Sequence, residues 1–289
     1  MAKLIRIDAE LVRRGLARSR AQAAELVRSG VVYVDGLAVT KPARQINPAQ
    51  AVLVKAGNDA EPWASRGAYK LLGALDYLGE AAPQIEGVRA LDAGASTGGF
   101  TDVLLRRGAA HVVAVDVGYG QIRWRLREDP RVTVIERTNV RTLDPALVAP
   151  APQLVVADLS FISLTLVIGA LVRCAAPDAA FLLMVKPQFE VGKESVGHGG
   201  VVRDVALHQA AIEQVVAAAY EAGLSLEAVA PSPLPGPAGN VEYFVYLRGS
   251  GGRAIAPQPC ESDGEGLPCV VTNSIQAAIA AGPAGAAAI

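Results

Sequence analysis

The stretch Leu91-Asp92-Ala93-Gly94-Ala95-Ser96-Thr97-Gly98-Gly99-Phe100 decides the fold of this chain. It follows an apolar segment, Val88–Asp92, that is typical of a buried strand, and it opens a helix predicted over Gly98–Arg107. Glycines at such a turn let the backbone approach a ligand closely. The next predicted strand, His111–Asp116, ends 18 residues after Gly98 on an acid that can bind both hydroxyls of an adenosine ribose. The turn therefore predicts a nucleoside-containing cofactor.

Two cofactors fit this turn, NAD and S-adenosylmethionine. The G-x-G-x-x-G fingerprint that binds the pyrophosphate of NAD is absent, and no Gly-Lys-Ser/Thr follows that would make a P-loop. Asp92 stands just before the glycines, as an acid does in the similar turn of methyltransferases that use S-adenosylmethionine. We favour S-adenosylmethionine, and an NAD-dependent oxidoreductase stays as the alternative.

Strands and helices alternate from residue 88 onwards, which is typical of a doubly wound, Rossmann-like α/β sheet. Further strands are predicted over Val132–Ile135, Leu154–Asp158, Ala179–Lys186, Leu224–Ala230 and Val241–Leu247, and further helices over Leu164–Arg173 and Ala206–Glu221. A short Pro- and Gly-rich stretch separates the last two strands, so we expect a parallel sheet with one antiparallel strand.

The region before this sheet forms a separate, small α+β unit. Near-helical spacing of apolar residues predicts two short helices with a break around Gly15 and Ser19. Asp35-Gly36 is a strong hairpin turn between two short strands. We therefore predict a small domain over 1–56, a linker over 57–65, the sheet domain over 66–249, and a largely mobile Gly/Pro/Ala-rich tail over 250–289 with one helical stretch near 273–281.

Charge divides the chain in the same way. The net charge of −1 hides a balance of +6 over residues 1–70, with 12 Lys and Arg against 6 Asp and Glu, and −7 over the remainder. A basic end on an acidic body predicts a module that binds a polyanion. The longest apolar run, Ala179–Val185, has seven residues, far short of the roughly 20 of a membrane span. With no signal peptide and no clustering of the three cysteines and three histidines, we expect a cytoplasmic protein without a structural metal.

Charged residues stand where ligands bind in such sheets. Only six lysines occur against 21 arginines, so a well-placed lysine is notable. Asp158 and Lys186 end two strands that we expect to be neighbours, and Glu242 begins the antiparallel strand and so faces the same edge. Lys70 lies just before the sheet. A lysine that is shielded from water beside a second lysine gives up its proton more readily, so it can act as a base on a ribose 2′-hydroxyl.

These residues resemble known families. Lys70, Asp158, Lys186 and Glu242 are similar to the Lys-Asp-Lys-Glu tetrad of FtsJ/RrmJ-type ribose 2′-O-methyltransferases. Arg6-Ile7-Asp8-Ala9-Glu10-Leu11 and Ser19–Leu26 resemble the S4 RNA-binding domain. Together with LDAGASTGGFT, VVADLSFISL, VKPQFEVGK and PLPGPAGNVEYF, they resemble the TlyA family of rRNA methyltransferases, also called hemolysins, over about residues 3–248.

The resemblance implies methylation of cytidine 2′-hydroxyls in 16S and 23S rRNA within ribosomal subunits, and sensitivity to capreomycin-type antibiotics. It implies Lys186 as the base, Asp158 as its support, and Lys70 and Glu242 as the groups that orient the ribose. The implied cofactor residues are Asp92, Gly94, Ala95, Ser96, Gly98, Phe100, Asp116, Asn139 and Asp158. The linker sequence Glu61-Pro62-Trp63-Ala64 departs from the Arg-Ala-Trp-Val of the family.

The basic module offers arginines that can follow RNA phosphates and shape, namely Arg6, Arg14, Arg18 and Arg20, with Arg66 at the junction to the sheet domain. We expect neither DNA nor a membrane as a partner, and the oligomeric state is open. Two other function classes stay as alternatives beside the oxidoreductase. One is a non-catalytic RNA-binding factor of ribosome assembly, against which the complete tetrad argues. The other is a pore-forming cytolysin, for which the chain has no cationic amphipathic segment.

Overall fold

The computed structural model describes residues 4–28, 30–35, 37–54, 63–197, 199–251 and 269–283. The chain divides into two compact units, residues 1–62 and 63–289. Most of the expected linker, 57–62, and most of the tail, 252–268 and 284–289, lie outside the described residues. No helix in the described part of the chain is long and apolar enough to cross a bilayer.

The N-terminal unit packs two short helices against small antiparallel sheets. α1 (Ile7–Arg13) and α2 (Arg20–Arg28) are joined by a turn in which Gly15 has a φ of 72°, as the predicted break requires. Two sheets are formed, β1 (Ile5–Arg6) with β4 (Gln45–Ile46), and β3 (Leu37–Ala38) with β2 (Val32–Val34) and β5 (Val52–Val54). Both helices bury their apolar faces, with Ile7, Leu11, Ala23 and Val27 in one small core.

The larger unit is built on one seven-stranded sheet. Its strands are β6 (Arg89–Ala93), β7 (His111–Val115), β8 (Val132–Ile135), β9 (Leu154–Ala157), β10 (Ala180–Val185), β11 (Leu224–Pro231) and β12 (Tyr243–Gly249). Their order across the sheet is β11-β12-β10-β9-β6-β7-β8. β12 runs antiparallel to both of its neighbours, and the other described pairings are parallel. The predicted fold class is therefore confirmed.

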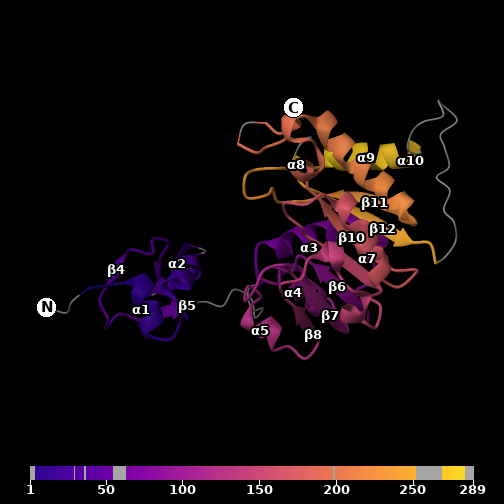
Figure 1. The fold of residues 1–289 in the computed structure, drawn as a ribbon. Coiled ribbons are helices and arrows are strands. Elements are labelled where there is room, and N and C mark those ends of the chain that lie inside the picture. Colours follow the sequence, from indigo (N-terminus) through magenta and orange to yellow (C-terminus); the bar gives the residue numbers. More distant parts are fainter. Residues whose placement is uncertain are drawn as a thin grey trace. The chain divides into compact units, whose positions relative to one another are not determined.

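Helices cover both faces of this sheet (Figure 1). One face carries α3 (Gly67–Leu78), α4 (Gly99–Arg106) and α5 (Trp124–Arg127). The other face carries α6 (Pro145–Val148), α7 (Ile168–Cys174), α9 (Val205–Glu221) and α10 (Cys269–Ala281). Short 3-10 turns, η1 (Gly79–Ala81), η2 (Val140–Thr142), η3 (Leu164–Leu166) and η4 (Lys193–Ser195), and a four-residue helix, α8 (Pro187–Glu190), complete the unit.

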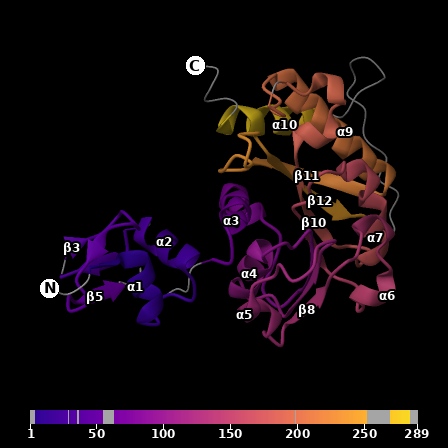
Figure 2. The same ribbon diagram turned by 60° about the vertical axis from the view of Figure 1, so that its left-hand side comes forward.

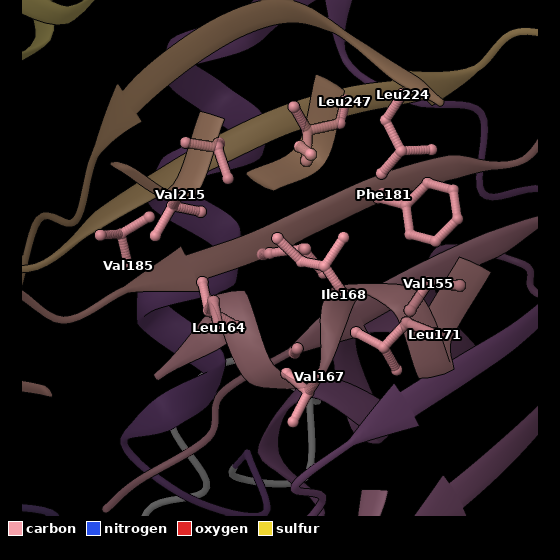
Figure 3. Close-up of a cluster of buried hydrophobic side chains, with 14 of the residues drawn as sticks. Val155, Leu164, Val167, Ile168, Leu171, Phe181, Val185, Val215, Leu224 and Leu247 are labelled. Carbon is pink, nitrogen blue, oxygen red and sulfur yellow. The ribbon is translucent and has the colours of Figure 1, made fainter. Parts of the chain in front are cut away.

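Strand β10 shows why both faces must be covered. All of its six residues are buried. Because successive strand side chains point to opposite faces, Leu182 and Met184 pack toward α3 and α4. Phe181 and Val185 belong to the other core, in which Figure 3 shows them with Ile168 of α7 and other apolar side chains. A strand that is buried on both faces reads in sequence as an uninterrupted apolar run, and this one does.

Helix α10 belongs to the packed larger unit. The sequence predicted a helical stretch over 273–281 inside a largely mobile tail, whereas the helix begins at Cys269 and Val271, Ile275, Ala278 and Ile279 enter the core. Figures 1 and 2 show α10 beside α9, and Ser274 Oγ accepts a hydrogen bond from the backbone N–H of Val229 in β11. This part of the predicted tail is therefore a structural element of the sheet domain.

Candidate active site

Lys186 lies at the centre of the candidate site. It follows the last residue of β10 and caps the start of α8, so its side chain leaves the sheet at the carboxyl edge. Its Nζ lies 2.6 Å from Oδ1 of Asp158, in an ion pair that lacks hydrogen-bond alignment, and it donates a hydrogen bond of 2.9 Å to Oγ of Ser160. Asp158 follows β9, the parallel neighbour of β10. The predicted juxtaposition of Lys186 and Asp158 is therefore present.

The second lysine is paired in the same manner. Lys70, in the first turn of α3, donates a hydrogen bond of 2.5 Å to Oε2 of Glu242. Glu242 immediately precedes β12, whose first residue, Tyr243, pairs with Val185 at the end of β10. The reversed direction of β12 thus brings the start of that strand to the edge where β10 ends. Lys70 and Glu242 are only 6% and 1% exposed, so each charge depends on the other for its partner.

Two adjoining cavities meet at Asp158. One, the lysine cavity, has a volume of about 520 Å³ and is lined by Lys70, Lys186, Asp158, Arg66 and Asp92 among others. The other, of about 500 Å³, is lined by Asp116, Gln121, Thr138, Asn139 and Phe161 among others. Gly94, Ser96, Asp158 and Ser160 line both cavities. A volume of this size suits a small organic cofactor, and the shared wall would place such a ligand next to the lysines.

The glycine-rich turn has a packing role as well as space for a ligand. Gly94 has a φ of 85°, and a Cβ there would lie 2.7 Å from the carbonyl oxygen of Asp158. Gly98 has a φ of 92°, and a Cβ there would lie 2.3 Å from Leu126. Gly98 is not among the residues that line the two cavities. A glycine is therefore needed at position 98 because α5 packs closely against the turn. At position 94, a glycine lets the turn approach the loop that carries Asp158.

Asp92 has the properties expected of a carboxylate that binds a cationic group of a ligand. It is fully buried and lines the lysine cavity, and its Oδ2 accepts hydrogen bonds from the backbone N–H and the hydroxyl of Thr101. Its Oδ1 has no hydrogen-bond partner among the described residues. Burial raises the pKa of Asp92 to about 7. An ammonium group beside Oδ1 would satisfy this atom, and the methionine part of S-adenosylmethionine has one.

Asp116 and Asn139, two of the expected cofactor residues, line the other cavity. The carboxylate of Asp116 accepts hydrogen bonds from the backbone N–H groups of Ser96, at 2.8 Å, and Gly118, at 2.6 Å, so it is held in one orientation. Asn139 caps η2 through its Oδ1, which accepts from Arg141 N–H. Phe100 lines the lysine cavity but is 3% exposed and stacks on Phe244, so it also serves the core.

Sequence reasoning missed three residues of the site, Ser160, Gln121 and Phe161. Ser160 and Phe161 follow Asp158 directly, but a sequence does not reveal which of two successive side chains faces a cavity. Phe161 is 91% exposed, has a φ of 63° and packs against Phe189, with the ring centroids 5.3 Å apart. An exposed aromatic ring in a strained conformation beside a cavity is an unusual use of a phenylalanine, and it points to a ligand.

The arginines predicted to bind RNA differ in whether a group of the protein already binds their guanidinium. Arg6 and Arg20 pair with the buried carboxylate of Asp8, and Arg14 donates to buried Glu10 and to the carbonyl groups of Pro48 and Gln50. Arg18 is exposed and has no ion pair within the described residues. In the larger unit, Arg66 donates to the carbonyl oxygen of Pro235 and lines the lysine cavity.

Comparison with known proteins identifies a family for each of the two domains. Residues 63–249 match the FtsJ-like methyltransferase family and residues 5–52 match the S4 domain. The 16S/23S rRNA (cytidine-2′-O)-methyltransferase TlyA of Mycobacterium tuberculosis is 56% identical over 261 residues, which cover 90% of this chain and 96% of the relative. The 23S rRNA (cytidine-2′-O)-methyltransferase TlyA of Campylobacter jejuni is 32% identical over 79% of this chain and 93% of its own length.

A solved structure is similar as well. A protein from Streptococcus thermophilus that carries a hemolysin name superposes with a TM-score of 0.66 at 33% identity, covering 96% of both chains.

Proposed function

The chain belongs to the FtsJ-like methyltransferase family, and from this premise we propose that it methylates ribose 2′-hydroxyls of cytidines in ribosomal RNA. It is an S-adenosylmethionine-dependent enzyme, related to the TlyA proteins. One observation carries the proposal: the buried Lys186 is paired with Asp158, the residue at which the two cavities meet. An amine held at that point can reach both a hydroxyl in one cavity and the reactive end of a cofactor in the other.

The described residues fit the cofactor part by part. Asp116 would accept hydrogen bonds from the adenosine ribose, and the free Oδ1 of Asp92 would accept one from the ammonium. The backbone of Gly94, Ala95 and Ser96 would lie along the methionine part. Asn139 lines the second cavity, which would hold the adenosine. When bound, S-adenosylmethionine supplies a methyl group on a positively charged sulfur. Gly98 would act only through the shape of the turn.

Lys186 is the base in this proposal. Its Nζ, as the free amine, would accept the proton of the 2′-hydroxyl while that oxygen forms its bond to the methyl carbon. The bond between that carbon and sulfur would break at the same time, so that the sulfur keeps the electron pair and leaves as a neutral thioether. Asp158 and Ser160 hold the amine in place before the reaction, and Asp158 stabilises the ammonium that results. Lys70, neutralised by Glu242, lines the same cavity and would orient the ribose through hydrogen bonds to its oxygens.

The RNA would be recognised at several places. The S4 domain offers Arg18, and Arg6 and Arg20 retain exposed guanidinium groups although they are paired. Arg66 lines the lysine cavity, where a phosphate next to the target ribose would pass. The exposed ring of Phe161 offers a face on which a base taken out of its helix can stack. We place the enzyme in the cytoplasm, where ribosomal subunits are, and expect its loss to reduce capreomycin sensitivity.

Both ribosomal subunits are the proposed substrates, because the 56% identical relative is named for 16S and 23S rRNA. The test is methyl transfer from labelled S-adenosylmethionine to isolated small and large subunits, followed by mapping of 2′-O-methylcytidine. We expect product on both subunits with the wild-type chain and none with Lys186→Ala. Methylation of a base, or no transfer to either subunit, would contradict the proposal. Transfer to the large subunit alone would restrict the enzyme to 23S rRNA.

A further inference from the structure

Glu190 is a buried carboxylate that the proposed reaction does not use. It ends α8, four residues after Lys186, and it is 7% exposed. Its Oε2 accepts a hydrogen bond of 2.5 Å from the hydroxyl of Ser163, and its Oε1 accepts one of 2.9 Å from the backbone N–H of Leu164. Both donors belong to the start of η3, in the loop that leaves β9. Glu190 therefore joins the segment after β10 to the segment after β9.

These two segments meet at three successive places. Nearest the sheet, Lys186 contacts Asp158 and Ser160. Farther along, Phe189 packs against Phe161. Last, Glu190 accepts the two hydrogen bonds from the start of η3. The segment 158–163 has no helix or strand of its own between β9 and η3, so its position depends on contacts of this kind.

The segment also includes a residue in a costly conformation. Phe161 has a φ of 63°, in the left-handed region that residues with a side chain seldom adopt. Such a conformation is unfavourable and persists where the surroundings impose it. At one end the strand β9 holds the segment, and at the other end Glu190 holds Ser163 and Leu164. Without the hydrogen bonds from Ser163 and Leu164 to Glu190, the backbone of Phe161 could relax, and Asp158 and Ser160 would move with it.

We propose that Glu190 is a positioning residue for methyl transfer: by hydrogen bonding to Ser163 and Leu164, it fixes Asp158 and Ser160 against Lys186 and keeps Phe161 in its exposed conformation. The proposal rests on the proposed function, because it assigns Glu190 a part in setting the geometry of the base. Burial raises the pKa of Glu190, which agrees with a carboxylate held away from water rather than one that serves a surface ion pair.

The inference distinguishes the hydrogen bonds of Glu190 from its charge. In Glu190→Gln, the amide oxygen can still accept from Leu164 N–H. The amide nitrogen can donate to Ser163 Oγ if the Ser163 hydroxyl turns toward Oγ1 of Thr165, which lies 2.7 Å away. Glu190→Gln thus keeps one hydrogen bond to Ser163 and one to Leu164, and only the second N–H of its amide gains no acceptor from these groups. In Glu190→Ala, by contrast, the hydroxyl and the buried N–H lose their acceptor.

The first measurement is single-turnover methyl transfer to ribosomal subunits at saturating S-adenosylmethionine and RNA. A displacement of about 1 Å at a reacting group can cost about a hundredfold in rate, so we expect Glu190→Ala to be slower by at least about tenfold and Glu190→Gln to stay within about threefold of wild type. Val148→Ala is the matched control, because Val148 is fully buried on α6 and its carbonyl group accepts from Arg89 at the start of β6, the opposite edge of the sheet. It should lower the melting temperature while leaving the transfer rate unchanged.

The second measurement does not depend on methyl transfer. Lys186 is 6% exposed, and its rate of acetylation by acetic anhydride, followed by mass spectrometry across a pH series, reports on its surroundings. We expect acetylation of Lys186 to be faster in Glu190→Ala than in wild type, Glu190→Gln or Val148→Ala. If wild type fails to methylate rRNA but Lys186 reactivity still follows this order, the proposed function fails and the positioning stands. Full activity and unchanged reactivity in Glu190→Ala, or equal losses in Glu190→Ala and Glu190→Gln, would overturn the positioning.

Discussion

The two units of this protein use the same kind of ion pair in opposite ways. In the N-terminal unit, a buried carboxylate is paired with an exposed arginine: Glu10 is fully buried, whereas the side chain of Arg13 beside it is 58% exposed. In the lysine cavity of the larger unit, both members of one pair are shielded: the side chains of Lys70 and Glu242 are 8% and 1% exposed. The first arrangement leaves the cation in contact with water, and the second removes it from water and turns it toward a cavity.

The difference shows how a paired cation can serve either structure or chemistry. An exposed guanidinium stays charged at any pH and is replaceable, because water solvates it if its partner is lost. A lysine inside a cavity has few alternatives to its carboxylate, so its position is fixed and its proton can be exchanged with a substrate. The following predictions probe this contrast, from the largest effect to the smallest.

Removing one cation from each unit should give very different results. Lys186→Ala is expected to reduce the rate of methyl transfer by about 10²–10⁴-fold, the usual contribution of a positioned base. Arg13→Ala, which removes an exposed guanidinium from the unit that does not carry the lysine cavity, should leave transfer intact. Single-turnover kinetics and thermal unfolding of both variants provide the comparison. Equal loss of transfer in the two variants would show that the contrast does not hold.

Removing the buried acid of the N-terminal unit should cost stability. Glu10 accepts three hydrogen bonds from Arg13 and Arg14, so Glu10→Ala is expected to destabilise this unit by about 2–3 kcal/mol. The hydrogen bond from Arg13 also lowers the pKa of Glu10 to about 2 from 4.5. A depressed pKa stabilises the fold above pH 4.5 and ceases to do so as the pH falls toward 2. Hydrogen exchange of residues 4–28 in the full chain, at falling pH, measures both effects. Unchanged exchange in Glu10→Ala would refute the assignment.

Asp92 predicts a pH dependence of cofactor affinity. Its pKa is raised by burial to about 7, so the free enzyme holds a proton there below that pH. An ammonium beside Oδ1 requires the carboxylate, and its binding must displace the proton. Affinity for S-adenosylmethionine should therefore fall as the pH drops below about 7, by up to about tenfold per unit. Calorimetry from pH 5.5 to 8.5 checks this, and Asp92→Asn should remove the dependence. A wild-type affinity that is constant over this range would contradict it.

The smallest expected effect separates two arginines of the basic module. Arg18→Glu should weaken binding to rRNA severalfold and reduce its salt dependence, since it removes one cation that is free to meet phosphate. Arg14→Glu should instead unfold the module, because it places a carboxylate against Glu10 and removes the hydrogen bonds to Pro48 and Gln50. Filter binding with hydrogen exchange as a control tells the two apart, and S-adenosylmethionine affinity should be unchanged in Arg18→Glu. Unaltered RNA affinity in Arg18→Glu would exclude that arginine from the interface.

Much of the fold could be predicted because each element carries its own signal. The strand β10 is an apolar run that is followed by Lys186. The strand β6 leads into the glycine-rich turn that opens α4. Helix α10 was only partly foreseen because its stability comes from elsewhere: its apolar residues pack on β11 and α9, which lie far away in the chain. Short elements such as α5 and β1 have too few residues to show a period.

The site divides in the same manner. Lys186, Asp158 and Glu242 could be placed because strand ends share an edge, which follows from topology alone. The roles of Ser160 and Glu190 depend on which way a loop side chain turns, and no periodicity records that. The same limit applies to Arg14: as a basic residue on a predicted helix it suggested phosphate, whereas the structure directs it to Glu10, Pro48 and Gln50.

The pairing of Lys70 with Glu242 has a consequence for the synthesis of the protein. The two residues are 172 positions apart, and Glu242 arrives on β12, the last strand of the sheet to leave the ribosome. Until then the ammonium of Lys70 lacks its partner. A nascent chain that already displays its basic module therefore lacks a complete site. The site is therefore complete only after the ribosome that makes the protein has finished that strand.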